Sequence, residues 1–201
     1  MNSALPGRTL ILTCDYKPLL GGIATYVHRL ADALSAAGGD VEVWAPQLPG
    51  AATFDGRQRF TTRRLDSIRQ QGINTALLRE LLGETRQGGF ARIISGLWMQ
   101  TGVAAMIASR LGAPPYYQLC YGIELMDSRH SRSLLAKRWL RARVLEGAAQ
   151  VWAISAHTRA LALSIAPRAV MRLLGPGVDL ERFAVSSDPG GTRERWAVGR
   201  N

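Results

Sequence analysis

Short apolar runs alternate with segments of helical spacing along most of this 201-residue chain. Such runs are typical of buried strands, and they predict strands at residues 9–14, 40–45, 58–63, 91–95, 115–120, 150–154 and 170–174. Apolar residues three and four positions apart predict helices between them, at residues 22–37, 73–86, 100–111, 131–147 and 156–166. Strands that alternate with helices favour an α/β fold, with a doubly wound, mainly parallel sheet and helices on both faces.

The segments that directly follow the strands are the expected location of a functional site. In a parallel sheet these segments meet at one edge, beyond the carboxyl ends of the strands, where ligands of such folds bind. They are a glycine pair, Gly21-Gly22, and four later segments at residues 96–101, 121–124, 155–158 and 175–179. We therefore expect the five segments to lie close together.

The glycine pair stands between the first predicted strand and the first predicted helix, in the sequence Asp15 to Val27. The first N–H groups of a helix have no partner within the helix, and the helix dipole favours an anion at that end. Because Gly21 and Gly22 lack Cβ atoms, a phosphate or a sugar could approach the main chain closely. The alternative is a tight turn with no ligand, and the G-x-G-x-x-G pattern of dinucleotide-binding loops is absent.

Composition limits the classes of protein that fit this chain. An apolar fraction of 47% is enough for a globular core, and no apolar run reaches the 18 residues of a transmembrane helix. The first eight residues lack the apolar centre of a secretion signal. Cys14 and Cys120 lie at the ends of apolar runs and are expected to be buried free thiols. The three histidines show no metal-ligand spacing with the cysteines, so no metal site is predicted.

The net charge of +10 comes almost entirely from arginine, and it is unevenly distributed. One basic cluster comprises Arg57, Arg59, Arg63, Arg64 and Arg69. A second comprises Arg129, Arg132, Lys137, Arg138, Arg141 and Arg143. Such clusters suit the phosphates of an anionic lipid, a phosphorylated substrate or a nucleic acid. Each could equally be a solvated face of the protein.

Composition shifts also predict where the domain ends. Residues 46–56 form a loop rich in proline and glycine, and residues 186–191 have the composition of a linker. We expect one domain over residues 1–185. Residues 186–201 would then be an interdomain linker and the start of a second domain, so the chain is expected to stop at a domain boundary.

Three segments together resemble the N-terminal half of a GT-B glycosyltransferase of family four. The segment Asp15 to Gly22 is similar to a D-x-x-P-x-x-G-G loop after the first strand. Tyr121-Gly122-Ile123-Glu124 lies where the family has an H-G-x-E-like segment, and residues 175–183 resemble its N-G-V-D-x-x-x-F segment. The order and spacing of these segments cover about residues 9–185.

The resemblance implies two Rossmann-like domains that face a cleft, with the acceptor held by the N-terminal domain. The co-substrate would be a nucleotide diphosphate sugar, no cofactor would be tightly bound, and the reaction would retain the anomeric configuration. Gly21 and Gly22 would lie against the donor diphosphate. The family's second-domain E-x7-E motif is absent from this chain, so the donor half would be missing and the chain alone is expected to be inactive.

The resemblance also suggests roles for individual residues. Many family members have a histidine at the position of Tyr121, whose pKa near 10 makes it a poor base. In a retaining reaction the leaving phosphate can accept the acceptor's proton, so Tyr121 would position the substrate or serve only in packing. The other residues expected at the acceptor side of the cleft are Asp15, Lys17, Trp98, Gln100, Thr101, Glu124, Ser155 and Thr158. Of these, Trp98 could instead be a core residue, Glu124 an arginine partner, and Ser155 a helix cap.

The predicted acceptor is a cell-envelope or lipid-linked glycan, which would place the protein in the cytoplasm, peripherally on the inner face of the plasma membrane. The helix at residues 131–147 is expected to pack an apolar side on the sheet, made of Leu134, Leu135, Trp139, Ala142 and Leu145. It would turn outward, toward anionic lipid or an anionic acceptor, the cations Arg132, Lys137, Arg141 and Arg143. The rival interpretation is a non-enzymatic α/β module whose basic surface binds nucleic acid or another anionic polymer, although its arginines are not interleaved with aromatic residues and no nucleic-acid motif is present.

Overall fold

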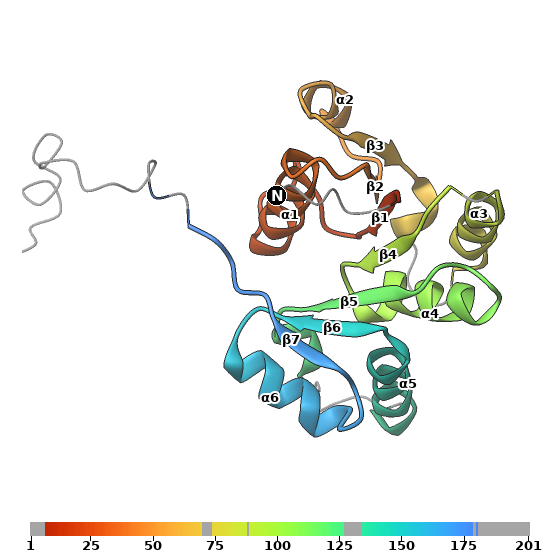
Figure 1. Cartoon of the computed structure of the whole chain (residues 1–201), viewed down its shortest axis with the longest axis vertical. Helices are drawn as coiled ribbons and strands as arrows, with labels where there is room; N and C mark the ends of the chain where they lie inside the picture. The colour runs from red at the N-terminus through yellow and green to blue at the C-terminus, as the bar shows by residue number, and fades with distance from the viewer. Residues whose placement is uncertain (1–6, 70–73, 88, 127–133, 179, 181–201) are drawn as a thin grey trace, which may run out of the picture.

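The computed structural model describes residues 7–69, 74–87, 89–126, 134–178 and 180, and it contains one seven-stranded sheet. The strands are β1 (Thr9–Leu12), β2 (Val41–Ala45), β3 (Thr61–Arg64), β4 (Arg92–Ser95), β5 (Tyr116–Cys120), β6 (Gln150–Ala153) and β7 (Met171–Leu173). Their order across the sheet is β3-β2-β1-β4-β5-β6-β7, and every pair is parallel (Figure 1). Each strand overlaps one of the seven predicted runs, so the predicted α/β fold with a parallel sheet is confirmed.

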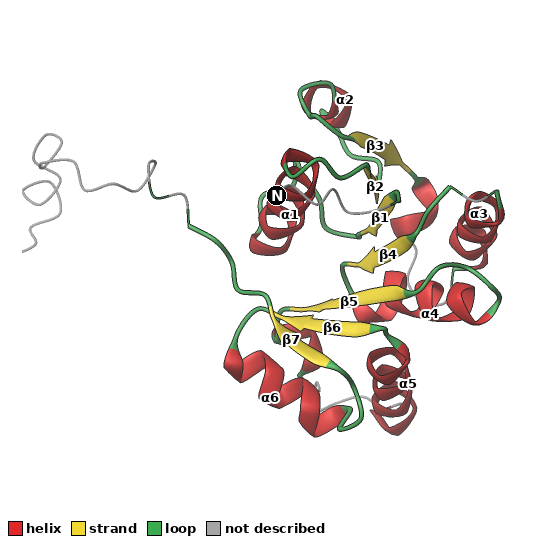
Figure 2. Cartoon of the chain, in the orientation of Figure 1, coloured by secondary structure: helices red, strands yellow, loops and turns green. Residues whose placement is uncertain are grey.

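Helical segments connect the strands, as Figure 2 shows. They are α1 (Gly22–Ala36), α2 (Ala51–Asp55), α3 (Thr75–Arg86), α4 (Val103–Arg110), α5 (Leu134–Gly147) and α6 (Ala156–Ile165), with short 3-10 turns η1 (Asp66–Arg69) and η3 (Ile123–Leu125). The turn η2 (Trp98–Gly102) is π-helical and leads into α4. All five predicted helices are present, although the third begins with this π turn.

The predicted loop at residues 46–56 is partly wrong, because it contains the short helix α2. Gly50 precedes α2 in the left-handed conformation, with φ of 73°, which a glycine adopts without strain. Arg64 on the neighbouring strand holds the Asp55 carboxylate at the other end of the helix. Local sequence spacing carries no information on that partner.

The sheet separates two hydrophobic layers, because successive strand residues point to opposite faces. Ile11, Val43 and Ile94 pack with Val27 and Ala31 of α1 on one face. On the other face, Leu10, Leu12 and Ile93 pack with residues of α3, α4, α5 and α6, among them Leu81, Ala105, Leu145 and Ala162. The helices therefore cover both faces, four on one and α1 with α2 on the other.

The division of the helices follows from the strand order. The chain moves from β1 outward through β2 to β3, then returns to β4 beside β1 and moves outward in the opposite direction. Right-handed crossovers in the two directions place their helices on opposite faces of the sheet. The chain reverses its direction between β1 and β4, and such a switch point is where sheets of this kind open a crevice for ligands.

Candidate functional site

The five segments expected to meet do follow the carboxyl ends of β1, β4, β5, β6 and β7 in the parallel sheet. The segments after β1 and β4 flank the switch point. They approach closely there, since a Cβ on Gly96 would lie 2.9 Å from Oγ1 of Thr13 and 3.1 Å from the Leu12 carbonyl oxygen. Tyr26 of α1 also donates a hydrogen bond of 2.7 Å to the Leu174 carbonyl. This bond joins the helix that follows the glycine pair to the residue that directly follows β7.

The glycine pair leaves the start of α1 open. Gly21 has an extended backbone and precedes the helix, and no side chain caps this end. Its carbonyl accepts the first helical hydrogen bond, 3.0 Å from the Thr25 amide. A Cβ added at Gly21 or Gly22 would meet no atom within 4 Å. The helix N-terminus is thus accessible to an anion, with its N–H groups and dipole aligned for one.

A groove of about 1110 Å³ runs from the glycine pair along α1. One wall is α1, and the other is the extended segment after β7, from Leu174 to Val178. Lys17 and Arg29 provide positive charge, and Asp32 is the acidic residue of the lining. Leu20, Leu174, Pro176 and Val178 supply apolar surface. The groove therefore combines an anion-binding end with a wall suited to less polar groups.

Tyr121 lies behind this groove. Its ring meets the ring of Tyr26 edge-on at 5.6 Å, and its amide donates a 2.7 Å hydrogen bond to Oε1 of Glu124. Its hydroxyl is buried and has no hydrogen-bond partner among the described residues, and the same is true of Oε2 of Glu124. Burial, and secondarily Tyr26 and Glu124, raise the Tyr121 pKa well above 10. At neutral pH this hydroxyl holds its proton and can donate a hydrogen bond, but it cannot act as a base.

Two residues expected in the cleft are buried beneath it. Trp98 is only 6% exposed, and its indole N–H donates to the Glu124 carbonyl oxygen at 2.9 Å. Thr101 is fully buried, with its hydroxyl 2.9 Å from that of Ser95 and bonded to the Leu97 backbone. The structure therefore places both residues beneath the cleft surface, where they stabilise the turn after β4, and Trp98 has the core position that was the alternative for it. Gln100 in the same turn is half-buried.

Ser155 and Thr158 mainly hold the start of α6. Ser155 is the N-cap residue, and its Oγ accepts a 3.1 Å hydrogen bond from the Thr158 amide. Thr158 is buried, and its hydroxyl donates to the Tyr121 carbonyl at 3.4 Å. Both residues therefore lie at the carboxyl edge, but Ser155 occupies the capping role and Thr158 supports Tyr121. Asp15 is half-buried in a turn in which its amide and carbonyl bond to the Thr13 hydroxyl.

The first basic cluster is largely neutralised within the protein. Arg59 pairs with Asp32 at 3.0 Å, Arg63 with Glu84 at 2.6 Å, and Arg64 with Asp55 at 2.7 Å. These carboxylates come from other elements of the fold. Three of the five arginines in the cluster thus have acidic partners, which weakens the case for a nucleic-acid surface there.

The orientation predicted for α5 was partly wrong. Lys137 and Arg143 are exposed and Leu145 is buried, as expected. Arg141, expected to face outward, is only 3% exposed, and its guanidinium lies 5.7 Å from the centre of the Trp98 ring. Leu135 and Trp139, expected to face the sheet, are 83% and 61% exposed. Guanidinium stacking on an indole makes the burial of an arginine tolerable. Arg132 lies outside the described residues.

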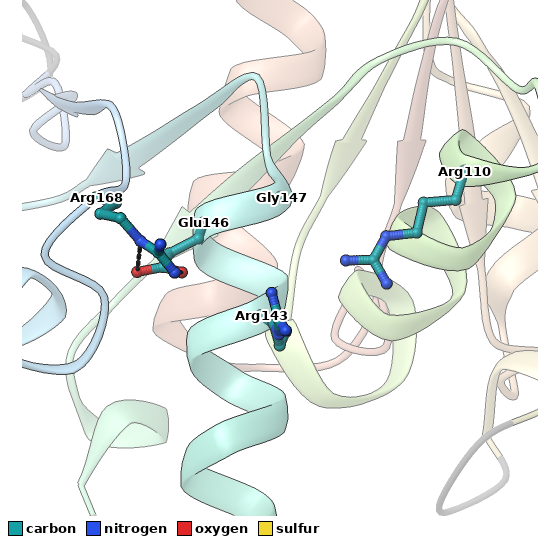
Figure 3. A pocket seen from close by; sticks show the side chains of 5 residues that line it. All are labelled: Arg110, Arg143, Glu146, Gly147 and Arg168. Atoms are coloured by element: carbon teal, nitrogen blue, oxygen red, sulfur yellow. Dashed lines mark hydrogen bonds and ion pairs between the residues drawn. The ribbon is translucent and has the colours of Figure 1, made fainter.

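A second hollow lies at the opposite edge of the sheet, where α4 and α5 end. Figure 3 shows its lining residues, Arg110, Arg143, Glu146, Gly147 and Arg168, around a volume of about 290 Å³. Arg168 bonds both carboxylate oxygens of Glu146, at 2.8 and 3.3 Å. Arg110 lies in the last turn of α4, where a cation stabilises the negative end of the helix dipole. The only acidic residue of this lining is therefore already paired with Arg168.

Among the described residues, no group of three or more histidine, cysteine or acidic side chains lies close enough together to hold a metal ion. No helix among them is sufficiently long and apolar to cross a membrane. The predicted linker at residues 186–201 lies outside the described part of the chain.

Comparison with solved structures shows which fold this is. HepE from Anabaena, solved with UDP and glucose, superposes with a TM-score of 0.68 at 16% identity, over 96% of this chain and 50% of its own. A glycosyltransferase from Rickettsia africae gives a TM-score of 0.65 at 12% identity, over 97% and 50% of the two chains. A fragment of sucrose-phosphate synthase from Thermosynechococcus elongatus gives 0.58 at 18%, over 88% and 93%. The chain therefore spans about half the length of the first two proteins and has the fold of one half of a GT-B glycosyltransferase.

Sequence comparison gives the family. A search of proteins with curated functions found no significant match. The profile of the glycosyl transferase 4-like domain matches residues 21–177, which begin at the glycine pair and end in the second wall of the groove. The chain belongs to the glycosyl transferase 4-like family.

Proposed function

We propose that this domain is the acceptor-binding half of a retaining glycosyltransferase that uses a nucleotide diphosphate sugar. The observation that carries the proposal is the uncapped N-terminus of α1, open at Gly21 and Gly22 beside the switch point of the sheet. A diphosphate is the part of such a donor that this end of a helix favours. The UDP and glucose bound to HepE support a nucleotide sugar as the co-substrate.

The domain would act together with a second half that supplies most of the donor site. The chain covers 50% of HepE, and a donor clamped between two halves needs both. The described chain contributes Lys17 and the α1 N-terminus for the diphosphate, and Tyr121 with Glu124 toward the acceptor. We therefore expect no efficient transfer by residues 1–201 alone.

In this mechanism Tyr121 is a positioning residue. Its hydroxyl and Oε2 of Glu124 are buried polar atoms without a partner among the described residues, and such atoms are rare in native proteins and call for an explanation. A role in positioning the acceptor would explain them, whereas the acceptor proton would go to the leaving phosphate. No enzymic base is required for that step.

The direct test is the reaction of the full-length protein with nucleotide diphosphate sugars. NMR of the first product should show the same anomeric configuration as the donor, and residues 1–201 alone should give no measurable turnover. Inversion of the anomeric centre would contradict the retaining mechanism. Binding of single-stranded nucleic acid without any sugar transfer would instead favour the rival binding module.

The acceptor is proposed to be a lipid-linked or cell-envelope glycan, used at the cytoplasmic face of an anionic membrane. Leu135 and Trp139 on α5 are exposed, and the Arg143 guanidinium lies 5.4 Å from the Trp139 ring centre. Lys137 is exposed on the same helix. Indoles favour the membrane interface, and each nearby cation adds about 1 kcal/mol on an anionic leaflet. The corrected orientation of α5 thus offers apolar and cationic groups together.

Vesicle sedimentation tests this surface. The protein should bind vesicles that contain anionic lipid at low salt and dissociate near physiological salt, because a few exposed cations are screened. Leu135→Ser combined with Trp139→Ser should abolish the binding. Leu111→Ser, which changes an exposed apolar residue at the far end of α4, is the control and should leave it unchanged. Equal binding by all three proteins, or none by the wild type, would exclude this surface.

A further inference from the structure

Arg64, the last residue of β3, makes four hydrogen bonds through its guanidinium group. Nε and Nη2 bond to the two carboxylate oxygens of Asp55, at 2.8 and 2.7 Å. Nη1 donates to the Pro46 carbonyl at 3.0 Å, and Nη2 also donates to the Lys17 carbonyl at 2.6 Å. The side chain is only 9% exposed, so these bonds are largely shielded from water.

These bonds connect three separate segments at the carboxyl edge of the sheet. Pro46 directly follows β2, Asp55 ends α2, and Lys17 belongs to the loop that leads from β1 to the glycine pair. The guanidinium also lies 5.3 Å from the ring centre of Tyr16, which is fully buried. A single planar group with several donors can hold this many acceptors at once, whereas a lysine ammonium group cannot match the geometry.

The loop from Lys17 to Gly22 has few other means of holding its shape. Leu19 and Leu20 are exposed, and the two glycines have no side chains to pack. The Leu19 amide bonds to the Tyr16 carbonyl at 3.1 Å, which fixes the first turn of the loop. The bond from Arg64 reaches the Lys17 carbonyl within that turn and holds the turn against β3. Lys17 is also a residue whose side chain lines the groove.

We propose that Arg64 is a positioning residue for the donor site: its guanidinium fixes the backbone at Lys17, and thereby sets where Lys17 and the N-terminus of α1 present their positive charge. Arg64 itself does not line the groove, and it reaches the lining only through the Lys17 carbonyl. The inference rests on the proposed function, in which the donor diphosphate binds at Gly21 and Gly22. It assigns to an arginine of the first basic cluster a role within the domain, in place of binding an external polyanion.

The test compares Arg64→Gln with Arg63→Gln in the full-length protein. Arg63 is the neighbouring arginine, but it pairs with Glu84 and lies over Trp44, with no bond to the loop. Arg64→Gln should raise the KM for the nucleotide sugar about tenfold, because displacement of a binding group by about 1 Å is costly. The KM for the acceptor should stay within about twofold, and Arg63→Gln should change neither constant.

Hydrogen exchange in the same proteins gives a readout that does not depend on the donor. Exchange of the Leu19 amide, which is bonded to the Tyr16 carbonyl, should accelerate about tenfold in Arg64→Gln and remain unchanged in Arg63→Gln. Since Arg64→Gln leaves the Asp55 carboxylate without its partner, Arg64→Gln combined with Asp55→Asn should be measured as well. That double variant removes the stranded charge and should show the same change in exchange and in donor KM.

The outcomes separate this inference from the proposed function. If Gly22→Val impairs donor use but neither Arg64 variant alters the donor KM, the donor site stands and the positioning role is overturned. If exchange of the Leu19 amide accelerates while donor use is insensitive to both Arg64 and Gly22, the donor does not bind at this loop. If neither Arg64 variant changes exchange of this amide, Arg64 does not fix the backbone at Lys17, and the inference is disproved.

Discussion

Gly22→Val in the full-length protein is expected to lower kcat/KM for the nucleotide sugar by on the order of 100-fold. The reason is that a branched side chain at the first position of α1 would occupy the space through which a diphosphate reaches the helix N-terminus. The fold should tolerate the change, because a Cβ at Gly22 meets no protein atom within 4 Å and the residue does not adopt a positive φ. Steady-state kinetics with varied donor would measure the loss.

The matched comparison is Gly22→Ala, whose single methyl group should give a smaller loss, on the order of tenfold. Urea unfolding of the same proteins should show free energies of unfolding within about 1 kcal/mol of the wild type, since valine and alanine are better helix formers than glycine. Unchanged donor kinetics in a folded Gly22→Val protein would reduce this loop to a simple turn.

Gly102→Val is expected to have the largest effect on stability, a loss of about 3 kcal/mol in the free energy of unfolding. Gly102 ends the π-helical turn that supports Trp98 and Thr101. A Cβ there would overlap the side-chain oxygen of Gln118 and lie 2.9 Å from Cγ1 of Val144. Gln118 is fully buried and its amide nitrogen is bonded to the Leu119 carbonyl at 2.9 Å, so it cannot move aside into solvent.

The control for this prediction is Gly83→Val. Gly83 is an exposed residue inside α3, and a Cβ there has no neighbour within 4 Å. Valine and glycine differ by only a few tenths of a kcal/mol in helix propensity, so stability should change by less than about 0.5 kcal/mol. Urea unfolding measures both variants. Equal losses in the free energy of unfolding at positions 83 and 102 would mean that the core around Gly102 has room for a side chain.

The fold could be predicted because its strands are buried on both sides. The residues of β1 and β2 are apolar at all but one position each, Thr9 and Glu42, and the intervening helices have regular spacing. The short helix α2 could not be predicted, since it depends on the left-handed Gly50 and on the Arg64–Asp55 pair across the sheet edge. Neither feature has a signal in local periodicity.

The site was less predictable than the fold, and the errors have a common cause. Sequence position correctly placed Gly21, Lys17 and Tyr121 at the carboxyl edge, because a parallel sheet brings its loops together there. Sequence position does not show which side chains line the groove and which are buried beneath it. Trp98 is covered by Arg141, an arginine that sequence reasoning assigned to the outside of α5. Only the three-dimensional packing of the two residues shows that each makes the burial of the other tolerable.

The position of β1 within the sheet has a consequence for the synthesis of the protein. Thr9 in β1 pairs with Val41 on one side and with Arg92 on the other, so β1 gains its second neighbour much later than its first. In the interval of synthesis when β3 has left the ribosome and β4 has not, a nascent layer of β1, β2 and β3 has an unpaired edge. Such edges recruit other chains and promote aggregation. Synonymous codons that slow translation in this interval should therefore reduce the yield of folded protein more than equally slow codons placed where β4 and β5 have already emerged.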